Sequence, residues 1–387
     1  MRWQEPSSPT GAHSRAFAIL SEPRSQIIAR RLGLGSATTA PMCLGCHSDA
    51  APAKGPRFQT SDGVGCEACH GGSANWIEPH KTGNRSASLA NGLVDLTNPS
   101  KRAAVCLDCH FSSADGGQFV SHRIMAAGHP RVAFELDLFS TLQQHHDEDA
   151  DYVRRKGKTN GVRFWAVGQA MAVERQLSLY SSPGFGAEGA FPEFYFFDCH
   201  SCHRRIFDDQ KFTPTTLDNP GRPIPVGMPP FNDENMIMLS AAARVVAPAL
   251  AQRFDADSKA FHAAIARDRP SAVAAAGKLR ASAGALSNAF SSASFDRAKT
   301  FAILDTVASE AIGARFTDYE GCVQAVMATD TLLNALVNSG QVSGGAAAGI
   351  RGDVNRAYAA VRDPNNFRPQ EFRRALGSAV RTIRTLR

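Results

Sequence analysis

Eight of the nine cysteines of this chain lie in four short motifs with the same spacing. In each motif two residues separate the cysteines, and a histidine directly follows the second one. The motifs are CLGCH (Cys43, Cys46, His47), CEACH (Cys66, Cys69, His70), CLDCH (Cys106, Cys109, His110) and CHSCH (Cys199, Cys202, His203). Paired thiols of this kind bind zinc, form redox-active dithiols or attach haem covalently.

The histidine distinguishes these three chemistries. Only 12 of the 387 residues are histidine, so chance would place one after a given cysteine pair in about 3% of cases. A four-cysteine zinc site needs no histidine there, and a thioredoxin-like dithiol needs one motif rather than four. Cys-x-x-Cys-His is the attachment signal of c-type haem. We therefore predict four covalently bound haem c groups, each with its motif histidine as the proximal iron ligand.

Other histidines are candidates for the second axial position of each iron. We predict His13, His80, His122 and His129 as these distal ligands, because they lie among the motifs in a region dense with irons. His122 and His129 would share one face of a helix. The glycine and proline around His129 also fit a helix end, which is the alternative interpretation of that segment.

The remaining histidines and the ninth cysteine favour structural roles. His145 and His146 close an apolar run, where cations near a helix C-terminus are favourable. His200 lies inside the fourth motif and could reach only a neighbouring haem, and we expect His262 on an exposed helix face. Cys322 lies on an apolar stripe, which predicts a buried structural thiol.

These residues predict a mainly α protein with two parts. Residues 1–225 hold every motif and are expected to form a loop-rich tetrahaem c-type cytochrome domain, with one longer helix at 162–180. Little regular structure is needed there because porphyrins would replace layers of side chains. A proline-rich connector at 217–231 leads to residues 232–387, which we predict to be an alanine-rich α-helical bundle domain.

The bundle part shows helical periodicity, and we expect five to seven helices in it. The first would span 233–253. Thr317 and Glu320 have the spacing of a capping box, and Pro369 is placed to open the last helix. Residues 339–349 are rich in glycine and predict a break between two helices.

The N-terminal half resembles the cytochrome c-554 family of tetrahaem cytochromes, which are electron acceptors of hydroxylamine oxidoreductase. The similarity rests on the four motifs, on the phrase GVGCEACHGG at 63–72 and on a histidine before the first motif. It covers roughly residues 10–210, and the alanine-rich tail has no counterpart in the small members. The resemblance implies two histidine ligands at most irons and a five-coordinate iron at one.

Two functions fit these expectations. Haems crowded by four closely spaced motifs, with two imidazoles at each iron, would transfer electrons, and we favour this function. The alternative is a redox enzyme that acts on nitric oxide, hydroxylamine or nitrite at one open-coordination haem. With either function, the helical tail would dock a redox partner protein or form a homo-oligomer.

The composition limits the partners and the location. The formal charge of +6 is spread along the chain without a dense Lys/Arg tract, which argues against nucleic acid binding. The sequence contains no run of about 18 apolar residues, so we expect no integral membrane span. In bacteria haem c is attached outside the cytoplasmic membrane, so we expect a periplasmic or extracellular protein. The first residues lack a signal peptide's apolar stretch, which indicates a processed, truncated or misassigned start.

Overall fold

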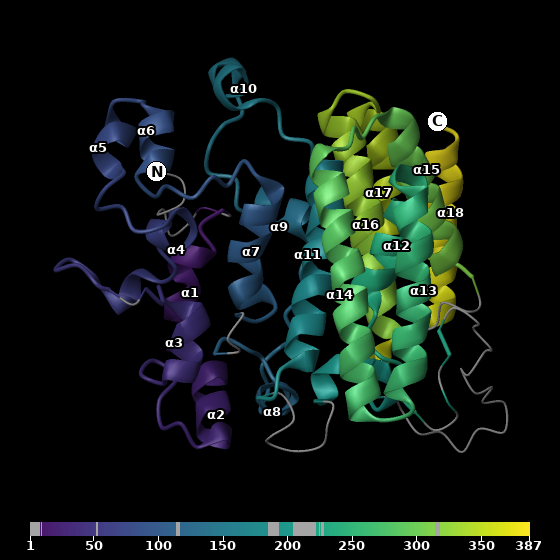
Figure 1. Ribbon diagram of the computed structural model, residues 1–387, viewed down its shortest axis with the longest axis horizontal. Coiled ribbons are helices and arrows are strands. Elements are labelled where there is room, and N and C mark those ends of the chain that lie inside the picture. The colour runs from purple at the N-terminus through teal and green to yellow at the C-terminus, as the bar shows by residue number, and fades with distance from the viewer. Residues whose placement is uncertain are drawn as a thin grey trace. The chain divides into compact units, whose positions relative to one another are not determined.

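The computed structural model is mainly α-helical, as the sequence predicts (Figure 1). It describes residues 8, 10–51, 53–113, 117–184, 193–203, 222–223, 225, 228–313 and 318–387. These residues contain no β-strand, only isolated bridges between Ser112 and Phe119 and between Phe197 and Phe231. The chain divides into two compact units, an N-terminal unit of residues 1–159 and a C-terminal unit of residues 160–387.

The N-terminal unit consists of short helices joined by loops. Its 3-10 turns are η2 (His13–Arg15) and η3 (Thr60–Asp62). Its α-helices are α1 (Ala16–Ile19), α2 (Pro23–Leu32), α3 (Pro41–His47), α4 (Cys66–His70), α5 (Ile77–Lys81), α6 (Arg85–Ala90), α7 (Pro99–His110), α8 (His122–Ala126), α9 (Leu136–Leu142) and α10 (Ala150–Lys156). The loop-rich character predicted for this part of the chain is confirmed.

Local sequence signals fix where these short helices start. Proline opens α2, α3 and α7, because its missing N–H costs nothing in the first turn. The side chain of Asn98 caps α7 by accepting a hydrogen bond from Lys101 N at 3.1 Å. Two of these helices, α3 and α7, end in cysteine motifs. The prolines at their starts therefore help to determine where each motif lies on its helix.

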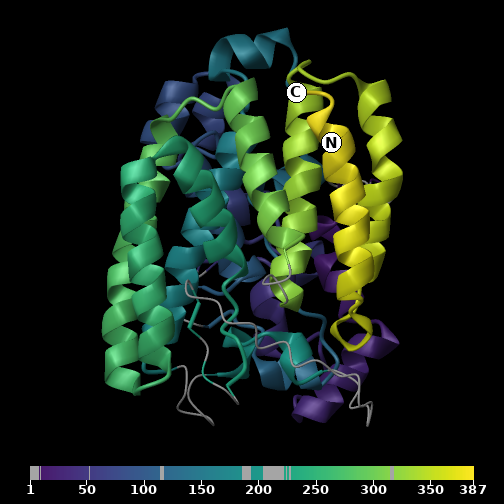
Figure 2. The same ribbon diagram turned by 90° about the vertical axis from the view of Figure 1, so that its right-hand side faces the viewer.

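The C-terminal unit is built from long helices. They are α11 (Gly161–Ser181), α12 (Glu234–Val246), α13 (Pro248–Ile265), α14 (Arg269–Ser292), α15 (Arg297–Ala311), α16 (Tyr319–Asn338), α17 (Gly344–Ala360) and α18 (Pro369–Arg384), with 3-10 turns η4 (Phe194–Phe196), η5 (Cys199–Ser201) and η6 (Pro364–Asn366). The helices α14 to α18 run side by side in both views (Figure 1 and Figure 2). The predicted helical bundle is confirmed, with seven described α-helices after residue 232.

The core of the C-terminal unit lies around α11, which packs against α14, α12 and α16. Buried residues lie on all sides of α11, among them Trp165, Val167 and Leu177, which are fully buried. A helix that is apolar all round must be covered by neighbours. Two buried polar contacts join α11 to the chain around α12: Gln176 Nε2 donates to Asn232 O, and Asn235 Nδ2 donates to Gln169 Oε1.

The compact units divide at a different place from the predicted domains of residues 1–225 and 232–387. The division falls after Thr159, because α11 packs with the bundle helices. The fourth motif, in and after η5, therefore belongs to the C-terminal unit, while the first three lie in the N-terminal unit. The longer helix predicted at 162–180 is present as α11.

Several helix boundaries differ from the sequence predictions. The helix predicted over 233–253 stops at Val246, since Pro248 cannot continue it and starts α13 instead. Ser343 caps α17, so the break after α16 is shorter than 339–349. Thr317 lies outside the described residues, and Asp318 caps α16. Pro369 does open α18, as predicted.

His262 and Cys322 are both buried. His262 is 3% exposed, so the prediction of an exposed position was wrong: α13 packs with this side against α12 and α14. Cys322 is 1% exposed, as its apolar stripe predicts. Among the described residues, none of the helices has the length and apolar character needed to cross a bilayer.

Candidate haem sites

The first three motifs each occupy the last turn of a helix. Motif one ends α3, motif two forms the whole of α4, and motif three ends α7. In a helix, residues three and four apart share one face. Each helical turn therefore presents its two thiols and its imidazole to the same side, as attachment of one porphyrin requires.

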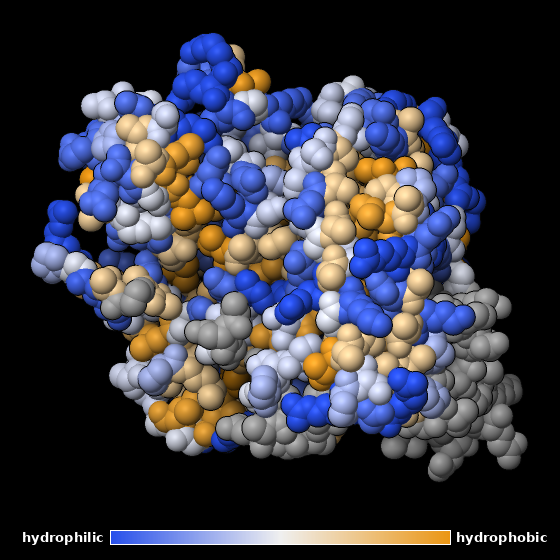
Figure 3. Space-filling model, in the orientation of Figure 1, coloured by the Kyte–Doolittle hydropathy of each residue, from blue (hydrophilic) through white to orange (hydrophobic). Residues whose placement is uncertain are grey.

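The motif residues of the N-terminal unit surround one cavity of about 850 Å³. Eight of the nine cysteines and histidines of the first three motifs line it, and Cys66 is the exception. Four further histidines line it as well: His13, His129, His145 and His146. The rest of the lining is mostly apolar, and apolar residues are also visible on the surface of this unit (Figure 3). A large apolar cavity with a few convergent polar groups is typical of a cofactor site.

Each motif histidine in this cavity faces a second histidine from elsewhere in the unit. The ring centroids are 5.9 Å apart for His110 and His13 and 6.3 Å apart for His47 and His129. An imidazole nitrogen binds a metal at about 2.0 Å and lies about 1.1 Å from its ring centroid, so rings on opposite sides of one metal ion have centroids roughly 6.2 Å apart. Both pairs therefore have the separation that one iron between them requires.

Hydrogen bonds hold the rings of His47 and His129 in place. His47 Nδ1 lies 2.8 Å from Ala16 O, and His129 Nδ1 lies 2.7 Å from Pro130 O. A carbonyl at Nδ1 fixes the tautomer with its proton there, which leaves Nε2 as the free donor atom for a metal. In both rings the atom left free is the one that an iron ligand needs.

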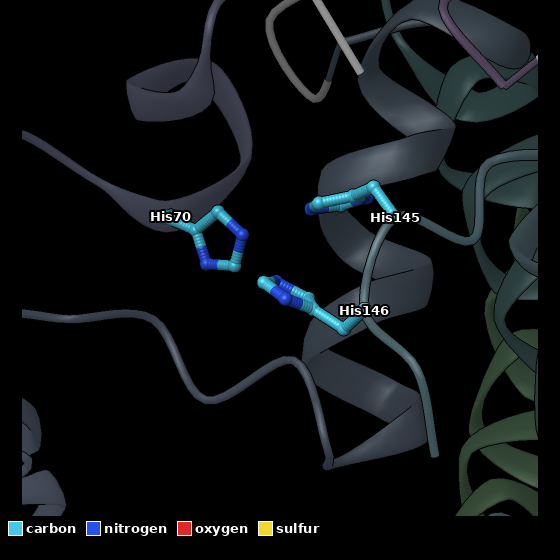
Figure 4. A group of neighbouring side chains, drawn as sticks. All are labelled: His70, His145 and His146. Carbon is cyan, nitrogen blue, oxygen red and sulfur yellow. The ribbon is translucent and has the colours of Figure 1, made fainter. Parts of the chain in front are cut away.

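His70 has two neighbours of this kind. Its ring centroid lies 6.3 Å from that of His145, and the ligand atoms of His70, His145 and His146 all lie within 4.8 Å of one another. Figure 4 shows the three rings close together, with His145 and His146 extending from consecutive residues after α9. His145 Nδ1 lies 2.8 Å from Gln143 O, which again leaves Nε2 free. Sequence reasoning did not select His145; its only signal was its position among the motifs.

The electrostatics of the cavity favour the neutral form of His13, His70, His110 and His129. Burial, assisted by neighbouring histidines, lowers the pKa of His70 and of His110 to about 4. Burial also lowers the pKa of His13 and of His129. Neutral imidazole is the form that coordinates iron, so the cavity favours ligation near pH 7. His110 Nδ1 is also buried without a hydrogen-bond partner. The donor set and the cavity therefore fit haem.

Motif three lies close to both other motifs of the unit. Gln118 Nε2 donates to Gly45 O of motif one and lies 3.2 Å from Cys109 Sγ of motif three. Motifs two and three pack through α4 and α7. Burial and the nearby Cys69 thiol raise the pKa of Cys106 to about 12. The cysteine motifs of the N-terminal unit are therefore neighbours.

Gly63 explains part of the phrase GVGCEACHGG. Its φ is +73°, in the left-handed region that favours glycine, and a Cβ there would lie 2.6 Å from His13 O. The next residue, Val64, donates its N–H to His13 O at 3.0 Å. This glycine lets the loop before motif two approach and hold the backbone of His13.

Two predicted distal ligands are placed differently. His80 is exposed and its ring stands 5.7 Å from the ring of Trp76. His122 is half-buried at the start of α8. Neither residue lines the cavity.

The fourth motif has a different local structure. Cys199 and His200 lie in the 3-10 turn η5, and Cys202 and His203 follow it and are exposed. The side chain of Asp198 caps this turn by accepting from Ser201 N at 2.9 Å. His200 Nδ1 lies 2.7 Å from Pro364 O, so this ring is engaged by the chain before α18.

Comparison with known proteins identifies one matching family. Residues 5–71 match the family model described as cytochrome c554 and c-prime. The matched region contains His13 and the first two motifs. No curated protein and no solved structure matches the chain. The N-terminal region is thus similar to the cytochrome c554 family, as its motifs indicated, and this supports a multihaem c-type cytochrome with a role in electron transfer.

Proposed function

We propose that this chain binds four haem c groups and passes single electrons through them to and from redox partner proteins. Cysteines of the four motifs form the thioether links, and the motif histidines are the proximal ligands. One observation supports the proposal most strongly. Each motif histidine that lines the cavity has a second imidazole opposite it, at the ring separation that one iron between them requires.

The proposed distal ligands follow from these pairs. His129 serves the first haem, His145 the second and His13 the third. His80 and His122 stay predicted distal ligands. With two imidazoles an iron has no vacant position for a substrate, and this favours electron transfer over catalysis at the three sites of the N-terminal unit.

Haem supplies a one-electron iron couple when bound. The chain's own residues determine how that couple works. The cavity wall is mostly apolar, and the hydrogen bonds at Nδ1 of His47, His129 and His145 hold the rings in one orientation. Motif three, next to both other motifs, makes the third haem the connecting member of the group.

The proposal includes an exported location, periplasmic or extracellular, because bacterial haem c is attached outside the cytoplasmic membrane. It also includes docking to a redox partner protein, with homo-oligomerisation as the alternative use of the helical bundle.

Matured protein purified with its haem tests the proposal. Intact mass and a pyridine haemochrome assay should both give four haems, and the ferric absorption and electron paramagnetic resonance spectra should show at least three low-spin irons. Carbon monoxide added to the reduced protein should leave those three unchanged. A colourless sample, or one with the mass of the bare polypeptide, would overturn haem binding. High-spin iron at two or more haems would overturn the ligand assignment.

A further inference from the structure

The fourth motif is held by the start of α16 through two reciprocal hydrogen bonds. Asp198 Oδ1 accepts from Tyr319 N at 2.7 Å, and the carboxylate of Glu320 accepts from Cys199 N at 3.1 and 3.2 Å. The first N–H groups of a helix need acceptors from outside it, and Asp198 supplies one. Both carboxylates are buried, Asp198 with 5% and Glu320 with 2% exposure.

Two further segments of the C-terminal unit hold the same motif. Before it, Phe197 forms an isolated bridge with Phe231. Within it, the ring of His200 packs 5.1 Å from the ring of Phe367, and its Nδ1 lies 2.7 Å from Pro364 O. Segments from three separate parts of the bundle sequence therefore fix this short turn, which has no long helix of its own.

A buried charge cluster lies beside these contacts. Arg222 Nη1 lies 2.6 Å from Asp318 Oδ2, and its Nε lies 2.5 Å from Asp233 Oδ2. His262 Nε2 lies 3.3 Å from the same Asp233 oxygen. Burial alone would lower the pKa of Arg222, but the surrounding carboxylates raise it, so the guanidinium is charged.

Within the described part of the chain, four buried carboxylates gather around this end of α16. The buried carboxylates are Asp198, Asp233, Asp318 and Glu320. The guanidinium of Arg222 pairs with Asp318 and Asp233, and the same Asp233 carboxylate contacts the imidazole of His262. Ferric haem carries one more positive charge than ferrous haem, so a buried carboxylate near a haem stabilises the ferric state.

We propose that the helical bundle is the seat of the fourth haem, in which Asp198 and Glu320 position the motif on α16 and their buried charge lowers that haem's reduction potential. The inference rests on the proposed haem at Cys199 and Cys202. It assigns to the bundle a role in tuning one haem of the four, and it makes Glu320 a positioning residue.

Glu320→Gln in the haem-loaded full chain tests this role. The amide still accepts from Cys199 N but removes the charge. In a potentiometric titration followed by absorption and electron paramagnetic resonance, the potential of one haem should rise while the other three stay unchanged. The matched control is Asp330→Asn, which removes one carboxylate from the same helix about 15 Å further along at 1.5 Å per residue and should move none of the four.

A second variant, Asp198→Asn, should raise the potential of the same haem, and it decides the question should the Gln variant fail to fold. Four haems with unchanged potentials in the folded variants would overturn this inference and leave the proposed function intact. A wild-type mass that shows no haem on the fourth motif would instead overturn the proposed function. An equal rise in Asp330→Asn would show a general charge effect and would also overturn the inference.

Discussion

Opposed imidazoles are the main feature of the N-terminal unit at the scale of single residues. His13, His129 and His145 come from segments far in sequence from the motif histidines that they face. An iron held by such a pair links distant segments directly, and binding energy of this kind contributes to the stability of the fold. As proposed ligands, these histidines would have a structural as well as a redox role.

Replacement of His145 and His146 tests the ligand of the second haem. His145→Ala should convert one haem to a high-spin form that binds carbon monoxide, whereas His146→Ala should leave all spectra unchanged. If His146 replaces its neighbour as ligand, the double variant should show the high-spin signal and His145→Ala alone should not. A double variant with every iron still low-spin would contradict the assignment.

Gly63→Ala should disturb His13 selectively. The new Cβ would meet His13 O at 2.6 Å, in addition to the cost of a positive φ. We expect loss of the low-spin signal of one haem, measured by electron paramagnetic resonance. Gly83→Ala is the matched control, because Gly83 also has a positive φ, +74°, but nothing lies within 4 Å of its Cβ position. Equal spectra for both variants would contradict the role of Gly63.

At the scale of elements, the start of α16 carries a buried acid. Asp318 caps the helix by accepting from Gly321 N at 2.7 Å, and it pairs with Arg222. Burial, together with Asp233 and Asp198, raises its pKa from the ordinary 3.8 to about 6, against the opposing effect of Arg222. The folded chain thus binds a proton between these pH values that the unfolded chain releases.

This difference predicts a pH-dependent stability. Between pH 4 and pH 6 the unfolding free energy should fall as pH rises, by about 3 kcal/mol at most from this one group. Asp318→Asn should remove that slope, because the Asn side chain does not titrate in this range. Asn is also an equally good helix cap, so the start of α16 should be kept. Urea unfolding of both proteins at pH 4, 5 and 6, followed by circular dichroism, measures it. Parallel pH profiles would contradict the raised pKa.

At the scale of the whole molecule, the two units differ in how many cysteine motifs they contain and in how much helix packing they have. The N-terminal unit has three motifs around a cavity and only short helices, whereas the C-terminal unit has one motif and a large side-chain core. Small domains without a sufficient apolar core depend on metals or covalent links for stability. The first unit should therefore depend on its haems more than the second does.

A core substitution in the bundle tests this division. Leu333 of α16 is fully buried, and Leu333→Ala should lower the unfolding free energy of the C-terminal unit by roughly 2–5 kcal/mol. The spectra of the three haems in the N-terminal unit should stay unchanged under native conditions. Thermal unfolding by circular dichroism, with haem absorption recorded in parallel, measures both. If the variant lost the low-spin signals of all haems at the same lowered temperature at which its helices unfold, the idea that the two units unfold separately would be contradicted.

The chemistry proposed for this protein can be read from its sequence because the haem-attachment signal is local. Two thiols and an imidazole within five residues form the signal, and one helical turn suffices to present them. The long helices of the bundle were equally readable, since the alanine-rich segment has clear helical periodicity. Helix starts at Pro99 and Pro369 follow from residues next to them in the chain.

The tertiary structure decided what depends on contacts between distant segments. Only packing brings His145 rather than His80 to His70, buries His262 beside Asp233 and joins α11 to the bundle. The same holds for Glu320, whose contact with Cys199 spans two parts of the chain. No periodicity or motif encodes such a pairing, because it arises from the shape and charge of surfaces that exist only after folding.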